Sequence, residues 1–585
     1  MRKLATGLIG AVLVGLVVLP PGVASAATIG IDARVTQHTY VRHDGGTDAA
    51  IEGCNSLVST DVVGNFRQKN EPFSVVDPQN PDIVIAGWND YCSDWMGLGF
   101  SIDGGQTWTN SLVPGYPADT SAEGMQSPEF IRTNSASDPV GAFDNDGHFF
   151  FGFLAYNGNA GPKTNSDAAV ARYDVVDPET NGGNPLDYVG TARVARGPAA
   201  ANFFGIFNDK NMIEVDRTGG VHDGSVYVCW TKFVGAASST TVVFSHSTDG
   251  GATFSTPIKI SGKTSGQGCD IAIEADGDVH VLWRDFAGQA SFQTFGVSAV
   301  RSGDGGETFG KVVKVATLDA YNPFDTARDC GDGADACPSE FVFHRVPLEP
   351  RITADPTGLL PGVFAIYNAV DPATIVPSTT SYSSAGSGGS GLVGQSKVYV
   401  ARSLDDGQTW SPILVADSPV GHQYFPDGDA LAGTLAVVWQ DSRTDGDYSI
   451  QRPVGNLADA TSSGTDALST FVAVSTNGTS FGAVQEVASV RQQPQYEMFD
   501  AASVPFLGDY NWLQLVDTGG GSLFGYMTWT DNRDVVTGTD PRETTQDGFD
   551  TKGCWVEDPP GTFTRTCFNG GGYNQNIYGN SITIP

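Results

Sequence analysis

Short runs of apolar and β-branched residues recur along the chain, and many of them close on an acidic turn. Five segments start at a charged residue or glycine and reach Asp or Glu six positions later: 71–77, 138–144, 210–216, 268–274 and 349–355. Other β-prone runs end in tryptophan: 83–88, 226–230, 279–283, 435–439 and 524–529. Runs of this length between turn residues are typical of β-strands. The pattern predicts an all-β protein made of repeated units, each with an inner strand followed by a returning second strand.

An eight-residue motif, Ser-x-Asp-x-Gly-x-Thr followed by Trp or Phe, punctuates these units. Its copies span 101–108, 247–254, 302–309 and 403–410, and a degenerate copy spans 475–481. In such a turn the Asp side chain accepts hydrogen bonds from backbone amides, and glycine supplies positive φ angles. The aromatic residue is expected to point into an apolar layer. Repetition at intervals of tens of residues predicts repeated supersecondary units, each with a hairpin at this motif.

The motif is the Asp box, and with it the chain resembles the sialidase-like (Asp-box, or BNR-repeat) β-propellers from about Asn70 to the C-terminus. The resemblance implies a single propeller of four-stranded blades, and the number of units favours seven blades over the six of a sialidase. The expected parts are a signal peptide (1–26), an N-terminal segment that packs on or closes the propeller (27–69), and the propeller (70–585) with insertions at 378–395 and 540–572. This fold does not fix a function, because Asp-box propellers include glycosidases and pure binding proteins.

The N-terminus predicts secretion. Arg2 and Lys3 precede an apolar run from Leu8 to Leu19, and the small residues at 24–26 fit a cleavage site. The run is too short to span a bilayer, so we expect an extracellular protein without membrane insertion. With 32 basic and 66 acidic residues the net charge is −34, which argues against a nucleic-acid partner and favours solubility, and we expect a monomer. No cofactor is required by these features; no EF-hand loop occurs, and a structural calcium ion stays open.

Eight cysteines in an exported chain predict up to four disulfides rather than metal ligands. We expect Cys54–Cys92 to pin the N-terminal segment onto the first blade and Cys229–Cys269 to tie adjacent blades. Small loops would be closed by Cys330–Cys337 and Cys554–Cys567. The spacing alone leaves other pairings open.

Propeller topology indicates which residues share a face. The inner strand starts on the ligand face, the second strand returns to it, and the hairpin between the third and fourth strands lies opposite, so the Asp boxes should point away from any site. The expected ring of inner-strand starts contains Asn70, Glu71, Asp138, Asp209, Lys210, Glu349, Arg351, Asp427, Asp509 and Tyr510. Trp-x-Asp ends several second strands, as at Trp88-Asn-Asp90, and its recurrence favours a structural role.

Glu71, Asp138 and Glu349 would place several carboxylates near one axis. Mutual repulsion would raise some of their pKa values and suit a general acid. Glycosidases need a pair of carboxyl groups roughly 5–10 Å apart. The alternative for each residue is a hydrogen-bonded carboxylate of the channel wall.

The sialidase resemblance implies specific roles. Sialidases use a Tyr activated by a Glu as nucleophile and an Asp as acid/base. By resemblance Tyr510 would be the nucleophile, Glu349 its partner, and Asp138 or Asp90 the acid.

Sialidases also hold the substrate carboxylate with three arginines. The candidates for substrate binding here are Arg67, Arg351 and Arg533, together with Glu71. The Arg-Ile-Pro motif of the family is missing, because Arg67 lies in Phe-Arg-Gln-Lys-Asn, and the arginines do not fall into the three expected blades.

The sequence thus predicts a secreted, sialidase-like glycoside hydrolase that acts on extracellular glycans or glycoproteins and retains configuration through a Tyr/Glu pair and a carboxylate acid/base. The alternative is a non-catalytic secreted propeller that binds carbohydrate or protein. Neither the sugar nor the linkage follows from the residues.

Overall fold

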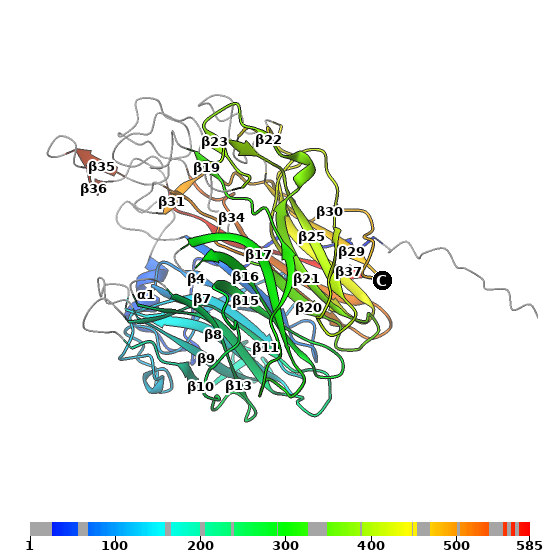
Figure 1. The fold of residues 1–585 in the computed structure, drawn as a ribbon. Coiled ribbons are helices and arrows are strands. Elements are labelled where there is room, and N and C mark those ends of the chain that lie inside the picture. Colours follow the sequence, from blue (N-terminus) through cyan, green and yellow to red (C-terminus); the bar gives the residue numbers. More distant parts are fainter. Residues whose placement is uncertain are drawn as a thin grey trace, which may run out of the picture.

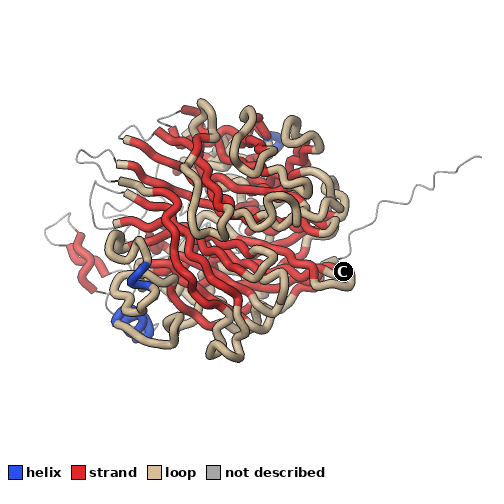
Figure 2. The backbone as a smooth tube through the Cα atoms, turned by 90° about the horizontal axis from the view of Figure 1, so that it is seen from below, coloured by secondary structure: helices blue, strands red, loops and turns tan. Residues whose placement is uncertain are grey.

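The structure, a computed structural model, describes residues 26–56, 68–157, 165–198, 205–235, 239–288, 291–325, 348–386, 389–446, 448–452, 468–499, 504–536, 554–557, 563–567 and 572–585. Strands dominate this part of the chain and form sheets that fan out around one axis (Figure 1). The helical elements within it are α1 (Ala49–Ser56) and two 3-10 turns, η1 (Gly124–Gln126) and η2 (Pro372–Thr374), which lie at the periphery (Figure 2). Residues 1–25, most of the expected signal peptide, lie outside the described residues.

Seven antiparallel sheets follow one another along the chain. The first consists of β3 (Lys69–Val76), β4 (Val84–Asp90), β5 (Trp95–Ser101) and β6 (Thr109–Leu112). The second consists of β7 (Ser135–Phe143), β8 (His148–Tyr156), β9 (Ser166–Val175) and β10 (Leu186–Ala195). The third consists of β11 (Ile206–Val215), β12 (Val226–Val234), β13 (Ser239–Ser247) and β14 (Ile258–Lys259). The fourth consists of β15 (Gly266–Ile273), β16 (Val279–Gly288), β17 (Ser291–Ser302) and β18 (Val313–Thr317).

The remaining sheets complete the ring. The fifth consists of β20 (Arg351–Ala354), β21 (Val363–Val370), β25 (Ser396–Ser403) and β26 (Ser411–Leu414). The sixth consists of β27 (Gln423–Leu431), β28 (Thr434–Asp441), β29 (Ser469–Ser475) and β30 (Gln485–Glu486). The seventh consists of β33 (Trp512–Asp517), β34 (Leu523–Asp531), β37 (Asn576–Ile584) and the N-terminal strands β1 (Thr28–Ile29) and β2 (Ala33–Arg34). Each first strand contacts the first strand of the next sheet, and β33 contacts β3. The predicted all-β, seven-bladed propeller is therefore confirmed.

The two ends of the chain meet in the seventh blade. β1 and β2 both pair antiparallel with β37, with Thr28 opposite Thr583 and Ala33 opposite Gly579. They provide the outer edge of the blade, which would otherwise present unpaired backbone groups. Residues 57–67 of the N-terminal segment lie outside the described residues.

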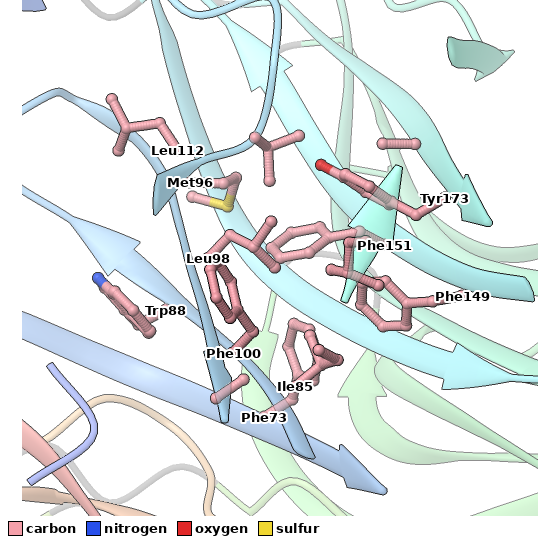
Figure 3. Close-up of a cluster of buried hydrophobic side chains, with 14 of the residues drawn as sticks. Phe73, Ile85, Trp88, Met96, Leu98, Phe100, Leu112, Phe149, Phe151 and Tyr173 are labelled. Atoms are coloured by element: carbon pink, nitrogen blue, oxygen red, sulfur yellow. The ribbon is translucent and has the colours of Figure 1, made fainter. Parts of the chain in front are cut away.

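Large aromatic side chains fill the spaces between blades. Figure 3 shows such a cluster between the first and second blades, where Phe73 of β3 faces Phe149 and Phe151 of β8. Trp88 is fully buried, and a Cβ atom on Gly97 of the adjacent strand would lie 2.0 Å from its indole nitrogen. Glycine at 97 is therefore needed to admit the ring. Truncating a core aromatic residue of this size costs about 3–5 kcal/mol.

Within the Trp-x-Asp motif, the tryptophan indole donates a hydrogen bond to the aspartate two residues later. The indole nitrogen of Trp439 donates to Asp441 at 2.8 Å, and that of Trp529 donates to Asp531 at 2.9 Å. A buried indole N–H needs an acceptor, and the carboxylate two residues later supplies it. The motif therefore fixes the end of the second strand in the blades that carry it.

The Asp-box segments form turns between third and fourth strands. In the turn at 101–108, Asp103 accepts from the amide of Thr107 at 2.9 Å and from its hydroxyl at 2.6 Å, and Ser101 Oγ accepts from Gly105 at 2.9 Å. The same bonds recur in the other three full copies. Since the first strands end on this side, these turns lie on the face opposite the first-strand starts.

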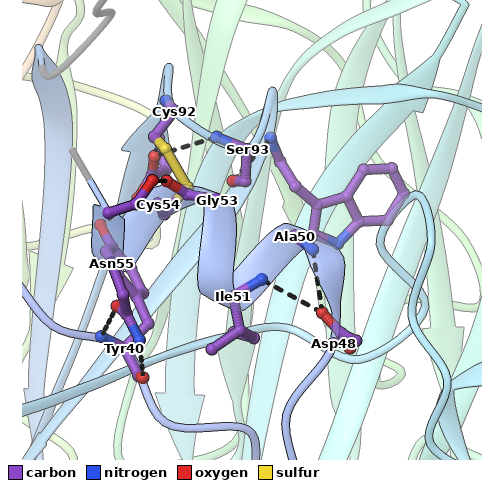
Figure 4. Close-up of a disulfide and its surroundings, with 12 residues drawn as sticks. Tyr40, Asp48, Ala50, Ile51, Gly53, Cys54, Asn55, Cys92 and Ser93 are labelled. Atoms are coloured by element: carbon purple, nitrogen blue, oxygen red, sulfur yellow. Dashed lines mark hydrogen bonds between the residues drawn. A yellow bond between two sulfur atoms is a disulfide. The ribbon is translucent and has the colours of Figure 1, made fainter.

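Two disulfides occur in the described residues, and both have the predicted partners. Cys54–Cys92 joins α1 to the loop after β4, and Asp48 caps this helix through the amides of Ala50 and Ile51 (Figure 4). Cys229–Cys269 joins β12 to β15 and thus two adjacent blades.

The other two predicted disulfides stay predictions, because the side chains of their cysteines lie outside the described part of the structure. Cys330 and Cys337 lie outside the described residues. In the 540–572 insertion, β35 (Cys554–Glu557) pairs with β36 (Phe563–Cys567) so that Cys554 stands opposite Cys567. None of the described helices is long and apolar enough to cross a bilayer.

Short two-stranded pairs lie in the segments that belong to the fifth blade and precede the seventh. β22 (Val376–Pro377) pairs with β24 (Leu392–Val393), and β19 (Phe324–Asp325) pairs with β23 (Tyr382–Ser383). The Ser/Gly-rich insertion at 378–395 thus contains regular structure in its described part. β31 (Glu497–Phe499) and β32 (Val504–Pro505) form another short pair before the last blade.

Candidate functional site

The first strands of five blades share a β-bulge near their N-terminal ends. Their pairing with the second strand skips two residues, and the skipped stretch holds a residue with positive φ. These residues are Glu71 (54°), Asp138 (57°), Lys210 (51°), Gly268 (68°) and Phe425 (47°). For a non-glycine residue this conformation costs about 1–3 kcal/mol, and it re-aims the side chain. We call the charged cluster at this end of the axis the axis mouth: Glu71, Asp138, Asp209, Lys210, Glu349, Arg351, Asp509 and Tyr510.

Lys210 lies at the centre of this cluster. Its ammonium group pairs with the carboxylate of Asp509, lies 3.5 Å from Glu71 Oε1, and lies 5.5 Å from the centre of the Tyr510 ring. Burial opposes the charge, but the carboxylates of Asp509 and Glu71 raise the pKa of Lys210 well above its usual value. The lysine is therefore cationic at any physiological pH.

Hydrogen bonds hold the mouth residues of the first three blades together. Asn89 Nδ2 donates to Glu71 Oε2 at 2.9 Å, and Asn89 Oδ1 accepts from the amide of Asp138 at 3.1 Å. Asp138 Oδ2 in turn accepts from the amide of Lys210 at 3.0 Å. Each blade thus positions the charged residue of the next.

Tyr510 lies shortly before β33, the first strand of the seventh blade. It faces the mouth residues of the first three blades across the junction between the seventh and first blades. It is 5% exposed, and its hydroxyl donates to the carbonyl of Pro139 at 3.3 Å. Burial, followed by the carboxylates of Glu71 and Asp138, raises the pKa of Tyr510 well above 10, whereas Lys210 and Arg351 act in the opposite direction. The resting phenol is neutral, with two cations nearby to stabilise a phenolate.

Arg351 and Glu349 complete the mouth from the fifth blade. The guanidinium carbon of Arg351 lies 5.1 Å from the ring centre of Tyr510 and 4.8 Å from that of Trp512. Its Nε lies 3.7 Å from Asp427, and neither Nε nor Nη2 makes a hydrogen bond within the described chain. Glu349 Oε1 lies 3.3 Å from Arg284 Nη2 without hydrogen-bond geometry. These buried polar atoms remain available to a ligand or to water.

Three aspartates around the axis have pKa values in the physiological range. Burial, together with the carboxylates of Asp138 and Glu349, raises the pKa of Asp209 to about 7. Burial also raises the pKa of Asp270 to about 7 and that of Asp427 to about 6, although Arg351 opposes both shifts. Such carboxyl groups can donate a proton near neutral pH.

The structure gathers five of the eight residues singled out from the sequence. Glu71, Asp138, Glu349, Arg351 and Tyr510 all lie at the axis mouth. The hydroxyl of Tyr510 donates a hydrogen bond to the carbonyl of Pro139. The carboxylates that raise the pKa of Tyr510 most are those of Glu71 and Asp138, not that of Glu349.

Of the other three residues, two lie apart from the axis mouth and one lies outside the described residues. Asp90 accepts from Tyr40, from Trp88 at 3.4 Å and from the amide of Cys92 at 2.8 Å. Arg533 pairs with Asp531 at 2.7 Å and with Asp32 at 2.9 Å, in the part of the seventh blade that holds the N-terminal strands. Arg67 lies outside the described residues.

Four residues that bear on the site had no assigned role in the sequence: Asn89, Asp209, Lys210 and Asp509. Asp209 and Lys210 precede the core of their first strand as Asp138 does, and Asp509 precedes Tyr510. This shared position is why the sequence placed these three in the expected ring on the ligand face, although it gave them no role in the reaction. Asn89 carries no comparable signal, because its role depends on contacts between blades.

We compared the chain with known protein families, curated proteins and solved structures. No family model matches it, and no curated protein matches it. It is similar in fold to an α-L-arabinanase from Penicillium chrysogenum (12% identity, 71% of this chain and 94% of that chain covered, TM-score 0.37). It is also similar to the intramolecular trans-sialidase from Ruminococcus gnavus (12%, 65% and 92%, TM-score 0.35) and to a protein of unknown function from Dyadobacter fermentans DSM 18053 (12%, 71% and 94%, TM-score 0.37). At these scores the likeness concerns the fold alone.

Proposed function

We propose that the protein is a secreted glycoside hydrolase that acts on extracellular glycans, with the axis mouth as its active site and with sialidase-like, retaining chemistry. The supporting observation is the strained set of Glu71, Asp138 and Lys210, whose left-handed backbones bring charged side chains to Tyr510. Backbone strain of this kind concentrates at functional sites, because a fold gains no stability from it. Two disulfides agree with an oxidising, extracellular environment.

In the proposed reaction Tyr510 is the nucleophile. Its oxygen attacks the anomeric carbon while its proton passes to a mouth carboxylate, for which Glu71 is the best placed, and Lys210 and Arg351 stabilise the developing phenolate. Asp138 donates a proton to the leaving oxygen as the glycosidic bond breaks. Water, deprotonated by the Asp138 carboxylate, then attacks the anomeric carbon as its bond to the Tyr510 oxygen breaks; Glu71 returns its proton to the phenolate, and Asp138 is again protonated. These steps use groups of the chain itself and need no cofactor.

A non-catalytic, glycan-binding propeller is the second candidate. The observation in its favour is that Lys210 already pairs with Asp509 and Glu71, and that Glu349 and Arg351 have charged neighbours as well. Such pairs could serve only to hold the ring closed around a binding pocket.

The test is a screen of aryl sialosides and other aryl glycosides with the wild-type protein and with Tyr510→Phe, Glu71→Gln and Glu349→Gln. We expect turnover on at least one substrate, a loss of roughly 100-fold or more in kcat for Tyr510→Phe and Glu71→Gln, and unchanged Tm values. Tyr399→Phe is the matched control, since Tyr399 stacks on Tyr367 within the fifth blade.

The outcomes separate the two candidates. Full activity in both Tyr510→Phe and Glu71→Gln would place the reaction elsewhere. A large loss in Glu349→Gln but not in Glu71→Gln would make Glu349 the partner of the tyrosine. No turnover on any substrate, with binding on a glycan array, would favour the binding protein.

A further inference from the structure

A second cavity opens beside the axis mouth, between the first and second blades. Its wall comes from the end of β4 and the loop after it, which supply Asn89, Asp90 and Asp94, and from the start of β7. Tyr156, at the end of β8, forms the remaining side. All these segments end or begin on the ligand face. We call this space the side cavity.

The side cavity and the axis mouth share a border. Ser137 lines the side cavity, and the next residue, Asp138, lines the pocket at the mouth together with Glu349, Arg351 and Tyr510. Asn89 spans the border, because its amide group binds Glu71 of the mouth and the backbone of Asp138. A molecule that occupies both spaces must therefore pass Asp138.

The lining of the side cavity suits a sugar. Tyr156 offers an aromatic face, and its ring centre lies 6.4 Å from that of Phe207, while the carboxylate of Asp94 can accept hydrogen bonds from sugar hydroxyls. Aromatic surface combined with a few polar groups is the usual composition of a small-molecule site.

Charge restricts which sugar fits. Asp90 and Asp94 both contribute to the wall, and the described lining residues include no Lys, Arg or His. Asp94 has a left-handed backbone (φ 52°), and burial and the nearby Asp90 carboxylate raise its pKa. An anionic sugar would meet repulsion without a cation to offset it.

We propose that the side cavity is the leaving-group subsite: it holds the second, uncharged sugar of an oligosaccharide whose first sugar occupies the axis mouth. This inference rests on the proposed function. The glycosidic bond between the two sugars then lies beside Asp138. The proton of Asp138 passes to the departing oxygen as the carbon–oxygen bond breaks and the bond to Tyr510 forms. The second sugar leaves as an alcohol.

The experiment compares two kinds of substrate in the wild type, Tyr156→Ala, Tyr156→Phe and Asp94→Asn. Glycosyl fluorides of neutral sugars and of sialic acid have a leaving group too small to reach the side cavity, whereas the matching disaccharides fill it. We expect Tyr156→Ala to lower kcat/KM for a disaccharide about tenfold or more and to leave that for the fluoride unchanged, and Tyr156→Phe to restore most of the loss. Asp94→Asn should raise the relative kcat/KM of disaccharides with a uronate as the leaving sugar.

Asp187→Asn is the matched control, since Asp187 is an exposed acid on the outer strand of the second blade. Equal losses on fluoride and disaccharide, or no loss on either, would overturn the proposal. If no substrate is turned over, the proposed function fails, and calorimetric titration of the same disaccharides then decides the subsite. Weaker binding to Tyr156→Ala with normal binding to Asp187→Asn supports it, and unchanged or absent binding refutes it.

Discussion

The two faces of this propeller use the same residue type in opposite ways. On the Asp-box face, Asp249 and Asp304 accept hydrogen bonds from a threonine hydroxyl and a backbone amide, and these bonds lower their pKa values to about 2. At the axis mouth, burial and neighbouring carboxylates raise the pKa of Asp209 to about 7. The first environment keeps the carboxylate ionised at physiological pH, and the second allows the carboxyl group to change its protonation state near neutral pH. Only the second suits proton transfer.

The same contrast holds for the backbone. The left-handed positions of the turn at 101–108 are Gly104 and Gly105, which tolerate positive φ without strain. The left-handed positions at the mouth include Glu71, Asp138 and Lys210, which do not. The mouth thus holds three charged residues in left-handed backbone, whereas the turn at 101–108 uses glycine at its left-handed positions.

Adding one methyl group to a glycine of each face should separate stability from function. A Cβ atom on Gly105 would lie 2.0 Å from the Tyr526 ring, so Gly105→Ala should lower the free energy of unfolding by about 2–4 kcal/mol through overpacking and left-handed strain. A Cβ atom on Gly268 would lie 1.8 Å from Glu349 Oε2, the movable end of a side chain. Gly268→Ala should cost about 1–2 kcal/mol and displace Glu349.

Denaturant unfolding and substrate turnover measure the two effects. We expect Gly105→Ala to keep normal kcat per folded molecule, and Gly268→Ala to lose activity beyond its loss of stability. Equal stability and activity profiles for the two variants would contradict the division between the faces.

The pH dependence of stability should show both carboxylate populations. The raised pKa values of Asp209, Asp270 and Asp427, about 7, 7 and 6, lie above the unfolded value near 3.8. The stability they contribute is complete below about pH 4 and is lost as the pH rises through 6–7. Asp249 and Asp304 behave oppositely, and their contribution is lost as the pH falls toward about 2.

Thermal unfolding across pH should therefore give a maximum Tm at about pH 4, with a progressive decline toward pH 7. In Asp270→Asn the decline between pH 6 and 7 should become shallower, whereas Asp249→Asn should flatten only the acid side. A Tm that climbs steadily from pH 4 to 8 would show that the channel carboxylates are ionised without penalty.

A smaller effect concerns the fourth full Asp box. Asp406 has φ 56° at the position where the other copies have Gly104, Gly250 and Gly305. Asp406→Gly should therefore stabilise the protein by about 0.5 kcal/mol, visible as a slight increase in the urea midpoint. The corresponding change at the mouth, Asp138→Gly, should relieve strain but abolish turnover. A destabilised Asp406→Gly would mean that this side chain has a structural role.

Much of the fold could be predicted from local patterns. The tryptophan-ended runs and the repeated turns reveal the blades because each blade must bury an aromatic residue and staple a hairpin. The expected pairings Cys54–Cys92, from the N-terminal segment to the first blade, and Cys229–Cys269, between adjacent blades, are both present, although spacing alone left other pairings open. The starts of the first strands also led to all eight residues of the axis mouth, five of which had been given a role in the site.

The contacts inside the site could not be predicted in the same way. The bulges at Glu71, Asp138 and Lys210 rotate side chains by an amount that periodicity does not encode. Tyr510 meets carboxylates from the first two blades although 371 positions separate it from Pro139. Arg533 reaches Asp32 across 501 positions, so its distance from the axis depends on how the two chain ends combine.

The seventh blade has a consequence for biosynthesis. Tyr510 belongs to that blade and Glu71 to the first, so they become neighbours only where β33 comes to rest against β3. The blade that brings them together needs β37 together with β1 and β2, which lie more than 500 positions earlier in the chain. A nascent chain in which β37 has not yet been synthesised cannot complete this blade, so Tyr510 and Glu71 become stable neighbours only after β37 has paired with β34.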